Sequence, residues 1–393
     1  MSSRILAAAA LLLTAYGSRL TAQDTALVQG SIYQRPFIAS IGRVAVGGYL
    51  EANGSWHRTD GISEGPSFEV RRFNLFVFSS SGRRLRFTSE LEFEHGTEEI
   101  ALETALLDFV VTPSLVVRGG VLLVPIGAFN VNHDGPRYEF VDRPLVSTEI
   151  IPATLSEVGF GIHGRLAPPG VSVSYDLYLT NGLGEGVILN PLGRTHVPSG
   201  KGESLFAEDE NGSPAVSGRV ALRSQGLGEI GFSHYRGIYN RYEVEGMQVD
   251  ETRWLSLTAL DMEGRIGSVS LRGEAALANL ELATDLEEVL ADRQWGAYLD
   301  AVVPVFHPRI RGLESPVLSV AARFEYVDFN VGEFASTGQP RRDDQAAVTL
   351  GLSFRPIAGT VFRANYRFGA TRDLLGNPSQ RNAAVLIGLA TYF

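Results

Sequence analysis

Runs of about ten residues in which apolar and polar side chains alternate recur along most of this sequence. In residues 84–94, one face carries leucine and phenylalanine with a single serine, and the other carries arginine, threonine and glutamate. Residues 171–180 and 345–355 follow the same pattern. Successive side chains of a strand point to opposite faces, so one face of each run suits lipid and the other suits water. A soluble β-sandwich also alternates, but the length of the runs and the charge on their polar faces favour membrane-spanning strands.

The fold class that we predict is all-β: a transmembrane antiparallel β-barrel of about sixteen strands over residues 43–393, an even number as in bacterial outer-membrane barrels. The expected strands are 43–52, 68–78, 84–94, 100–111, 115–125, 156–166, 171–180, 215–223, 229–236, 252–262, 267–278, 294–303, 317–328, 345–355, 360–369 and 382–393. Between 215 and 305 the pattern is weaker and leaves fourteen or eighteen strands open. Short turns alternate with long loops, such as 53–67 and 181–214, as periplasmic turns and extracellular loops do.

Both ends of the chain carry signals for export and membrane assembly. Residues 1–22 read as a signal peptide, with Arg4 before an apolar stretch that is too short to span a bilayer. Residues 23–42 have no regular pattern and are expected to form a periplasmic lead-in. The last strand ends at Phe393 and resembles the insertion signal of bacterial outer-membrane proteins. The expected partners are therefore outer-membrane lipid, lipopolysaccharide and the barrel-assembly machinery, and the expected location is the bacterial outer membrane.

Several functional classes are disfavoured by composition and motifs. A net charge of −10 offers no basic footprint for nucleic acid, and the absence of cysteine excludes disulfides and thiolate metal sites. The stretch Gly61–Gly65 matches a nucleophile elbow, but its flanks are polar loop rather than strand and helix. The seven histidines show no i,i+4 pairing. We therefore expect no enzyme activity, no catalytic residue, no cofactor and no metal site.

The second-longest connection, residues 127–155, is expected to fold into the lumen and narrow it. It carries opposite charges close together, and its candidate constriction residues are Arg137, Arg143, Asp134, Glu139 and Asp142. Charges on the inward strand faces are a second candidate set, because rings of carboxylates favour cations and rings of arginine or lysine favour anions. These lumen-wall candidates are Arg72, Arg86, Arg118, Arg323, Arg363, Arg367, Glu90, Glu92 and Asp108.

An equally weighted alternative is that the wall arginines are only paired across strands. In residues 68–78, Arg71 and Arg72 are adjacent, so strict alternation allows only one of them to face inward.

Several stretches resemble the phosphate-selective porin O and P family. They are Val46–Leu50, Phe68–Phe73, Gly119–Gly127, Phe140–Leu145 and Glu157–Gly161. The resemblance implies a sixteen-stranded, usually trimeric pore whose third outer loop narrows the channel, with Arg137 and Arg143 as the constriction residues.

The sequence departs from the anion-selective members of that family, because carboxylates accompany both arginines in the loop and the whole chain is acidic. We therefore predict an outer-membrane porin for passive diffusion of small hydrophilic solutes or ions, with selectivity set by mixed charges. One alternative is a phosphate- or anion-selective channel. Another is a non-conducting barrel with a structural, adhesion or hydrolase role.

Overall fold

The computed structural model describes residues 39–41, 44–202, 206–209, 211–334 and 336–393. Residues Phe37–Phe393 form one compact unit. The predicted signal peptide, 1–22, and most of the predicted lead-in, 23–42, lie outside the described residues. Within the described ranges, no helix has the length and hydropathy needed to cross a bilayer.

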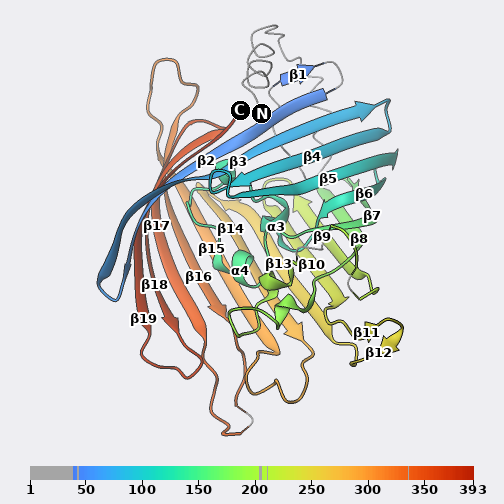
Figure 1. Cartoon of the computed structure of the whole chain (residues 1–393). Helices are drawn as coiled ribbons and strands as arrows, with labels where there is room; N and C mark the ends of the chain where they lie inside the picture. Colours follow the sequence, from blue (N-terminus) through green and yellow to red (C-terminus); the bar gives the residue numbers. More distant parts are fainter. Residues whose placement is uncertain (1–38, 42–43, 203–205, 210, 335) are drawn as a thin grey trace, which may run out of the picture. The chain divides into compact units, whose positions relative to one another are not determined.

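Sixteen long strands of the described chain form a closed antiparallel barrel (Figure 1). They are β2 (Val44–Thr59), β3 (Ile62–Ser81), β4 (Leu85–Glu94), β5 (Glu99–Thr112), β6 (Leu115–Leu123), β7 (Ser156–Leu166), β8 (Val171–Thr180), β9 (Ala215–Ser224), β10 (Gly228–Ile238), β13 (Trp254–Ile266), β14 (Val269–Leu280), β15 (Arg293–Phe306), β16 (Val317–Asp328), β17 (Asp344–Ile357), β18 (Thr360–Arg372) and β19 (Gln380–Tyr392). Each strand pairs with its neighbour in the chain, and β19 pairs with β2 to close the barrel. The predicted fold class and each of the sixteen strands are confirmed.

Three short strands lie outside this wall. The strand β1 (Ala39–Ile41) pairs with the beginning of β2. The strands β11 (Glu243–Val244) and β12 (Met247–Gln248) form a separate two-stranded sheet in the connection between β10 and β13.

The outer surface of the wall is a belt of exposed apolar side chains. Phe160 of β7 lies opposite Leu179 of β8, which in turn lies opposite Val216 of β9, and all three are exposed. Phe160 is 71% exposed, which in water would be an unfavourable place for a phenylalanine. A closed barrel leaves no unpaired strand edge in hydrocarbon, so the barrel and its apolar belt place the protein in the bacterial outer membrane.

The first outer connection differs from the expectation of a loop over 53–67. In the structure β2 and β3 stay paired through this region, with Ser55 opposite Ser67 and Trp56 opposite Pro66. They join at a two-residue turn, where Asp60 has φ 48° and Gly61 has φ 90°. Positive φ at both positions is the type I′ geometry, whose twist matches that of antiparallel strands. The Asp-Gly turn therefore keeps a segment rich in glycine and serine in strand form.

Candidate functional site

The third outer connection, residues 127–155, lies inside the barrel and is called the third loop below. It contains two short α-helices and a 3₁₀ turn: α3 (Gly127–Val131), η1 (Gly135–Arg137) and α4 (Leu145–Glu149). In Figure 1, α3 and α4 lie within the ring of strands. The predicted inward fold of this loop is confirmed.

Backbone hydrogen bonds attach the third loop to distant parts of the wall. The amide of Gly127 donates to Ser233 Oγ of β10 at 2.9 Å, and the amide of Leu145 donates to Glu325 Oε2 of β16 at 3.0 Å. Glu274 of β14 accepts from the amide of Phe129 at 3.1 Å and from Ser147 Oγ at 2.9 Å. Because β10, β14 and β16 are far along the barrel from β6 and β7, the loop crosses the lumen.

One asparagine holds the two stems of the loop together. Asn130 Nδ2 donates to the carbonyl oxygens of Val124 and Leu155, and Asn130 Oδ1 accepts from the amide of Leu155 at 2.7 Å. Further along, Tyr138 donates to the carbonyl of Asn132 at 2.6 Å. Burial raises the pKa of Tyr138 to about 12.

An apolar core that the sequence did not predict lies in the lumen beside β13 and β14. The inward faces of β13 and β14 carry Leu255, Leu257, Ala259, Ala276 and Ala278. Against them pack apolar residues of the third loop and of the next outer loop, residues 181–214. These are Ile126, Val146, Ile150, Leu183, Val187 and Val197. Each large side chain removed from water contributes roughly 1.5–3 kcal/mol, so this core holds the third loop in place. The only sequence signal was that 254–266 and 269–280 have apolar residues on both faces.

Other strands carry polar residues on their inward faces, and wall arginines there are paired with carboxylates. Arg118 of β6 makes two hydrogen bonds with Asp108 of β5, at 2.7 and 2.8 Å. Arg323 of β16 does the same with Asp300 of β15, at 2.7 and 2.8 Å. Such two-point contacts neutralise both partners and hold the wall together. The alternative of cross-strand pairing therefore applies to these arginines.

Two further wall arginines reach the third loop. Arg363 donates to Glu51 Oε1 at 2.7 Å and to the carbonyl of Phe140 at 2.7 Å. Arg367 lies 3.3 Å from Asp142 and 3.4 Å from Glu325. They therefore fasten the loop to β18 rather than standing free in the lumen.

The remaining wall candidates have different surroundings. Glu90 and Glu92 both accept from Asn74 Nδ2, at 2.7 and 2.9 Å. Within the described part of the chain Arg86 has no ion pair, although Asp108 is its cross-strand neighbour in register. Asp108 pairs with Arg118 instead, so the predicted wall set is not one connected ring.

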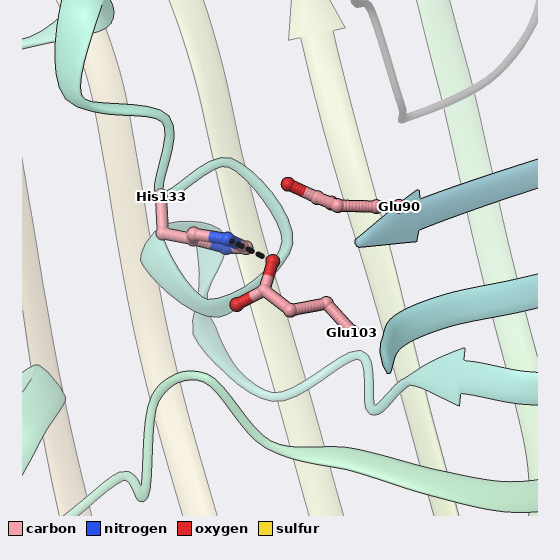
Figure 2. A group of neighbouring side chains, drawn as sticks. All are labelled: Glu90, Glu103 and His133. Carbon is pink, nitrogen blue, oxygen red and sulfur yellow. Dashed lines mark hydrogen bonds and ion pairs between the residues drawn. The ribbon is translucent and has the colours of Figure 1, made fainter. Parts of the chain in front are cut away.

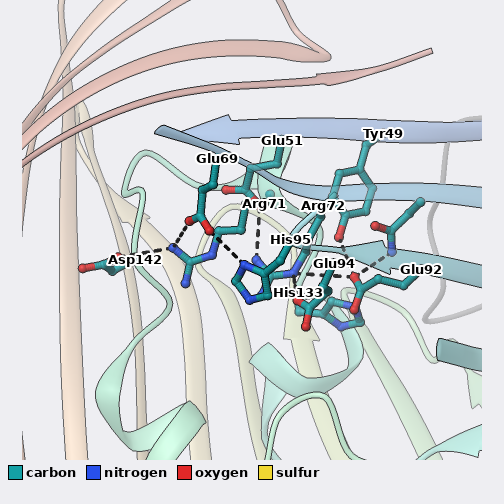
Figure 3. Close-up of polar contacts among 12 residues, drawn as sticks. Tyr49, Glu51, Glu69, Arg71, Arg72, Glu92, Glu94, His95, His133 and Asp142 are labelled. Carbon is teal, nitrogen blue, oxygen red and sulfur yellow. Dashed lines mark hydrogen bonds and ion pairs between the residues drawn. The ribbon is translucent and has the colours of Figure 1, made fainter. Parts of the chain in front are cut away.

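The expectation that only one of Arg71 and Arg72 faces inward was wrong. The register between β2 and β3 shifts at Glu51 and Ala52, which lie opposite Arg72 and Val70, so Arg71 is an extra residue in a β-bulge. A bulge interrupts strict alternation and turns a side chain to the other face. Figure 3 shows Arg71 reaching Asp142 of the third loop, at 3.6 Å, while the buried Arg72 lies among glutamates of the wall.

The three candidate carboxylates of the third loop are each tied to the wall. Asp142 lies near Arg71 and Arg367. Glu139 pairs with Arg355 at 2.7 Å. Asp134 accepts a hydrogen bond from the hydroxyl of Tyr392 at 2.8 Å. These contacts place the carboxylates at anchoring points, and the arginines opposite Glu139 and Asp142 compensate their charge.

The two candidate arginines of the third loop lack such close ion pairs, although the charge of Arg143 acts on Glu92 and Glu103 of the wall. Neither Arg137 nor Arg143 forms an ion pair with any described residue. Arg143 Nε and Nη2 are buried and lack hydrogen-bond partners in the part of the chain that the structure describes. Both arginines of the third loop therefore lack a close ion pair, although the loop sequence contains more carboxylates than arginines.

Arg137 also faces a cavity of about 910 Å³ at the end of the barrel where the strands are joined by short turns. We call this cavity the vestibule; by the rule for outer-membrane barrels, its end is periplasmic. Its charged lining residues are Arg137, Arg165, Arg223, Arg265, Arg272, Glu139, Glu263 and Asp300. Each of the three carboxylates has an arginine partner: Glu139 pairs with Arg355, Glu263 with Arg272, and Asp300 with Arg323. Arg223 pairs with Glu229, so the lining residues that carry charge without an ion pair among the described residues are Arg137, Arg165 and Arg265, and all three are positive.

No family model matches the chain. A protein of Aquifex aeolicus (strain VF5), described only as uncharacterized, is 27% identical over 365 residues, which cover 86% of this chain and 79% of that protein.

Solved structures of outer-membrane proteins share the fold at low sequence identity. The anion-selective porin from Comamonas acidovorans matches with a TM-score of 0.55 and 14% identity, covering 89% of this chain and 99% of that one. The outer membrane channel DcaP of Acinetobacter baumannii matches with a TM-score of 0.55 and 10% identity, covering 91% and 99%. The trimer form of OmpT, an outer membrane protein of Vibrio cholerae, matches with a TM-score of 0.52 and 12% identity, covering 89% and 99%. The chain has the fold of a porin-like outer-membrane barrel.

Proposed function

We propose that this protein is an outer-membrane channel for passive diffusion of small hydrophilic solutes, with a preference for anions. The observation that carries the proposal is the pairing of charges in the third loop. Glu139 and Asp142 are compensated by wall arginines, whereas Arg137 and Arg143 have no ion pair among the described residues. In a narrow, poorly hydrated passage an uncompensated charge attracts ions of the opposite sign more strongly than it does in bulk water.

The vestibule supports the same preference. Its excess of arginine extends the positive potential from Arg137 toward the end with short turns. The family resemblance adds phosphate as the anion of interest, and one structural neighbour is itself an anion-selective porin. In this proposal Arg137, which lines the vestibule, and its neighbour Arg143 set the preference for anions in spite of the loop's mixed charges.

A second candidate function follows from the apolar core in the lumen. Val146, Ile150 and their neighbours bury the third loop against β13 and β14, so the lumen beside these strands offers no aqueous path. A barrel blocked in this way would serve a structural or adhesion role. We favour the channel because the vestibule is a cavity of about 910 Å³ lined by charged side chains, and because solved porins and channels share the fold.

Conductance in planar lipid bilayers separates these two functions. We expect the refolded protein to produce discrete, ohmic current steps in potassium chloride, and liposomes containing it to swell in small neutral sugars. Millimolar phosphate should reduce the chloride current if phosphate binds at the loop arginines. Preparations that show heat-modifiable mobility on gels, and so contain folded barrels, but give no current and no swelling would support the plugged barrel and contradict the channel.

We further propose a homotrimer with a non-catalytic role, inserted through its last strand. The trimer is suggested by the family resemblance and by the neighbour described in trimer form. At the seam, Phe393 exchanges backbone hydrogen bonds with Gly48, at 3.0 and 3.2 Å, and its ring stacks on Phe73 at 5.5 Å. The residue that carries the proposed insertion signal, Phe393, therefore also helps to close the barrel. We propose that the surrounding membrane contains lipid and lipopolysaccharide.

Chemical cross-linking in detergent tests the oligomer. We expect a ladder that ends at three chains, because closed cyclic symmetry limits the size of the assembly. A ladder that stops at one chain, from a protein that is folded by gel mobility, would contradict the trimer.

A further inference from the structure

A group of three buried side chains lies where the third loop meets the wall on the side of β4 and β5. Glu90 comes from β4, Glu103 from β5 and His133 from the third loop, just after α3. One oxygen or nitrogen atom of each lies within 4.8 Å of the other two, and all three residues are buried. Figure 2 shows the two carboxylates and the imidazole pointing into the same space.

A second β-bulge aims Glu103 at this space. Across β4 and β5, Glu90 lies opposite Thr104 and Leu91 lies opposite Leu102, so Glu103 is an extra residue between them. Glu103 and Thr104 are consequently both buried, whereas Leu102 is on the exposed outer face. Bulges commonly redirect a side chain next to a functional site, and here the bulge directs a carboxylate toward a histidine.

The hydrogen bonds of His133 select the ring nitrogen that faces the carboxylates. Nδ1 lies 2.9 Å from the carbonyl oxygen of Asn130, which can only accept, so Nδ1 carries a hydrogen and donates it. Nε2 lies 3.0 Å from Glu103 Oε2. In the neutral imidazole, Nε2 then presents its electron pair to a carboxylate oxygen. This arrangement requires a proton or a cation between the two atoms, and a backbone carbonyl on the far nitrogen is how metal-binding histidines are usually held.

The surroundings contain more acid than base. Glu92 accepts from Asn74 and from the hydroxyl of Tyr49, and its nearest guanidinium, Arg72 at 3.6 Å, also serves Glu51 and Glu94. Figure 3 shows this network beside His133. Three buried carboxylates therefore face one imidazole and the guanidinium groups of Arg143 and of Arg72, and Arg72 is shared with Glu51 and Glu94. A divalent cation would compensate this excess of buried negative charge.

A buried amide oxygen is a further indication. Asn74 is completely buried, and its Nδ2 donates to both Glu90 and Glu92. Its Oδ1 has no hydrogen-bond partner among the described residues. An unsatisfied buried oxygen costs free energy, so the polar network beside Glu90 is incomplete among the described residues.

We propose that Glu90, Glu103 and His133 bind a divalent transition-metal ion, with Zn²⁺ as the first choice, and so link the third loop to the wall. Imidazole nitrogen and carboxylate oxygen are normal Zn²⁺ ligands at about 2.0–2.2 Å, and ligands around one ion lie roughly 3–4 Å apart. The ion joins three elements that are distant in sequence. It would fix the position of the segment that leads to Arg137. The site does not depend on whether the barrel conducts.

Metal titration of the refolded barrel tests the site. Protein treated with chelator and then dialysed would be titrated with Zn²⁺ by calorimetry, and with Co²⁺ by visible absorption. We expect one ion per chain and a defined Co²⁺ spectrum. His133→Ala and Glu103→Gln should weaken binding at least tenfold, because each removes a direct ligand. His57→Ala removes an exposed histidine of β2 as a matched control and should leave binding unchanged.

Variants that lose the fold are recognised by heat-modifiable gel mobility. Should His133→Ala or Glu103→Gln fail to form a barrel, Glu90→Gln decides, since it keeps the contact between His133 and Glu103 and removes one ligand. A folded Glu90→Gln variant that binds Zn²⁺ less tightly than the wild type supports the site. Absence of Zn²⁺ binding by the wild type, or equal affinity in the wild type and all folded ligand variants, would overturn it.

Discussion

Replacing both Arg137 and Arg143 by glutamate should convert the channel from anion preference to cation preference. Both positions carry arginines that lack a close ion pair among the described residues, and the replacement changes the local charge from positive to negative. Two unit charges about 4 Å apart interact by about 4 kcal/mol near a protein surface, and about 1.4 kcal/mol corresponds to a tenfold change in an equilibrium. We expect the ratio of chloride to potassium permeability to fall by roughly tenfold or more.

The matched control changes the net charge by the same amount away from the lumen. Arg309 and Arg311 are exposed in the connection between β15 and β16. Replacing both by glutamate should leave the permeability ratio near the wild-type value. Equal shifts in the two double variants would mean that selectivity follows total charge and not the third loop.

Replacing Val146 by aspartate should open the lumen. Val146 is fully buried in the apolar core, on α4. An unpaired carboxylate there would cost several kcal/mol, so the helix should leave its position against β13 and β14. The wall is closed by its own backbone hydrogen bonds, and we therefore expect a barrel that still forms but conducts several times more current per channel.

Thr148→Asp is the control for that variant, since it adds the same charge to the same helix at a half-buried position outside the apolar core. It should change single-channel conductance much less. If Val146→Asp gives folded channels of unchanged conductance, the apolar core does not set the size of the passage.

The strands were predictable because membrane and lumen impose a two-residue period on most of the wall. The rule failed where that period breaks. Arg71 and Glu103 are bulged residues, and a single extra residue leaves no signature in composition. Leu255 and Leu257 are apolar and yet face inward, because the third loop covers them. The alternation of apolar and polar residues cannot predict that a distant loop packs on an inward face. The turn at Asp60 was within reach of sequence reasoning, since Asp-Gly favours a tight hairpin.

The candidate site was predicted in part for a related reason. The length and charge of residues 127–155 suffice to identify an inward loop, and Arg137 and Arg143 were singled out with it. Which charges remain unpaired depends on contacts with β16 to β18, such as that between Glu139 and Arg355, more than two hundred positions away. The cluster of Glu90, Glu103 and His133 likewise joins three separate elements. A search for histidines spaced along one helix has no means of finding it.

The most direct test of the proposed function is the zero-current potential of the wild-type channel in a bilayer between two concentrations of potassium chloride. The pairing of the loop carboxylates predicts a potential whose sign corresponds to chloride crossing more readily than potassium. Raising the salt concentration on both sides should reduce its magnitude, because exposed charge is screened. A potential of the opposite sign at low salt would contradict the assignment of Arg137 and Arg143 as the charges that a solute meets.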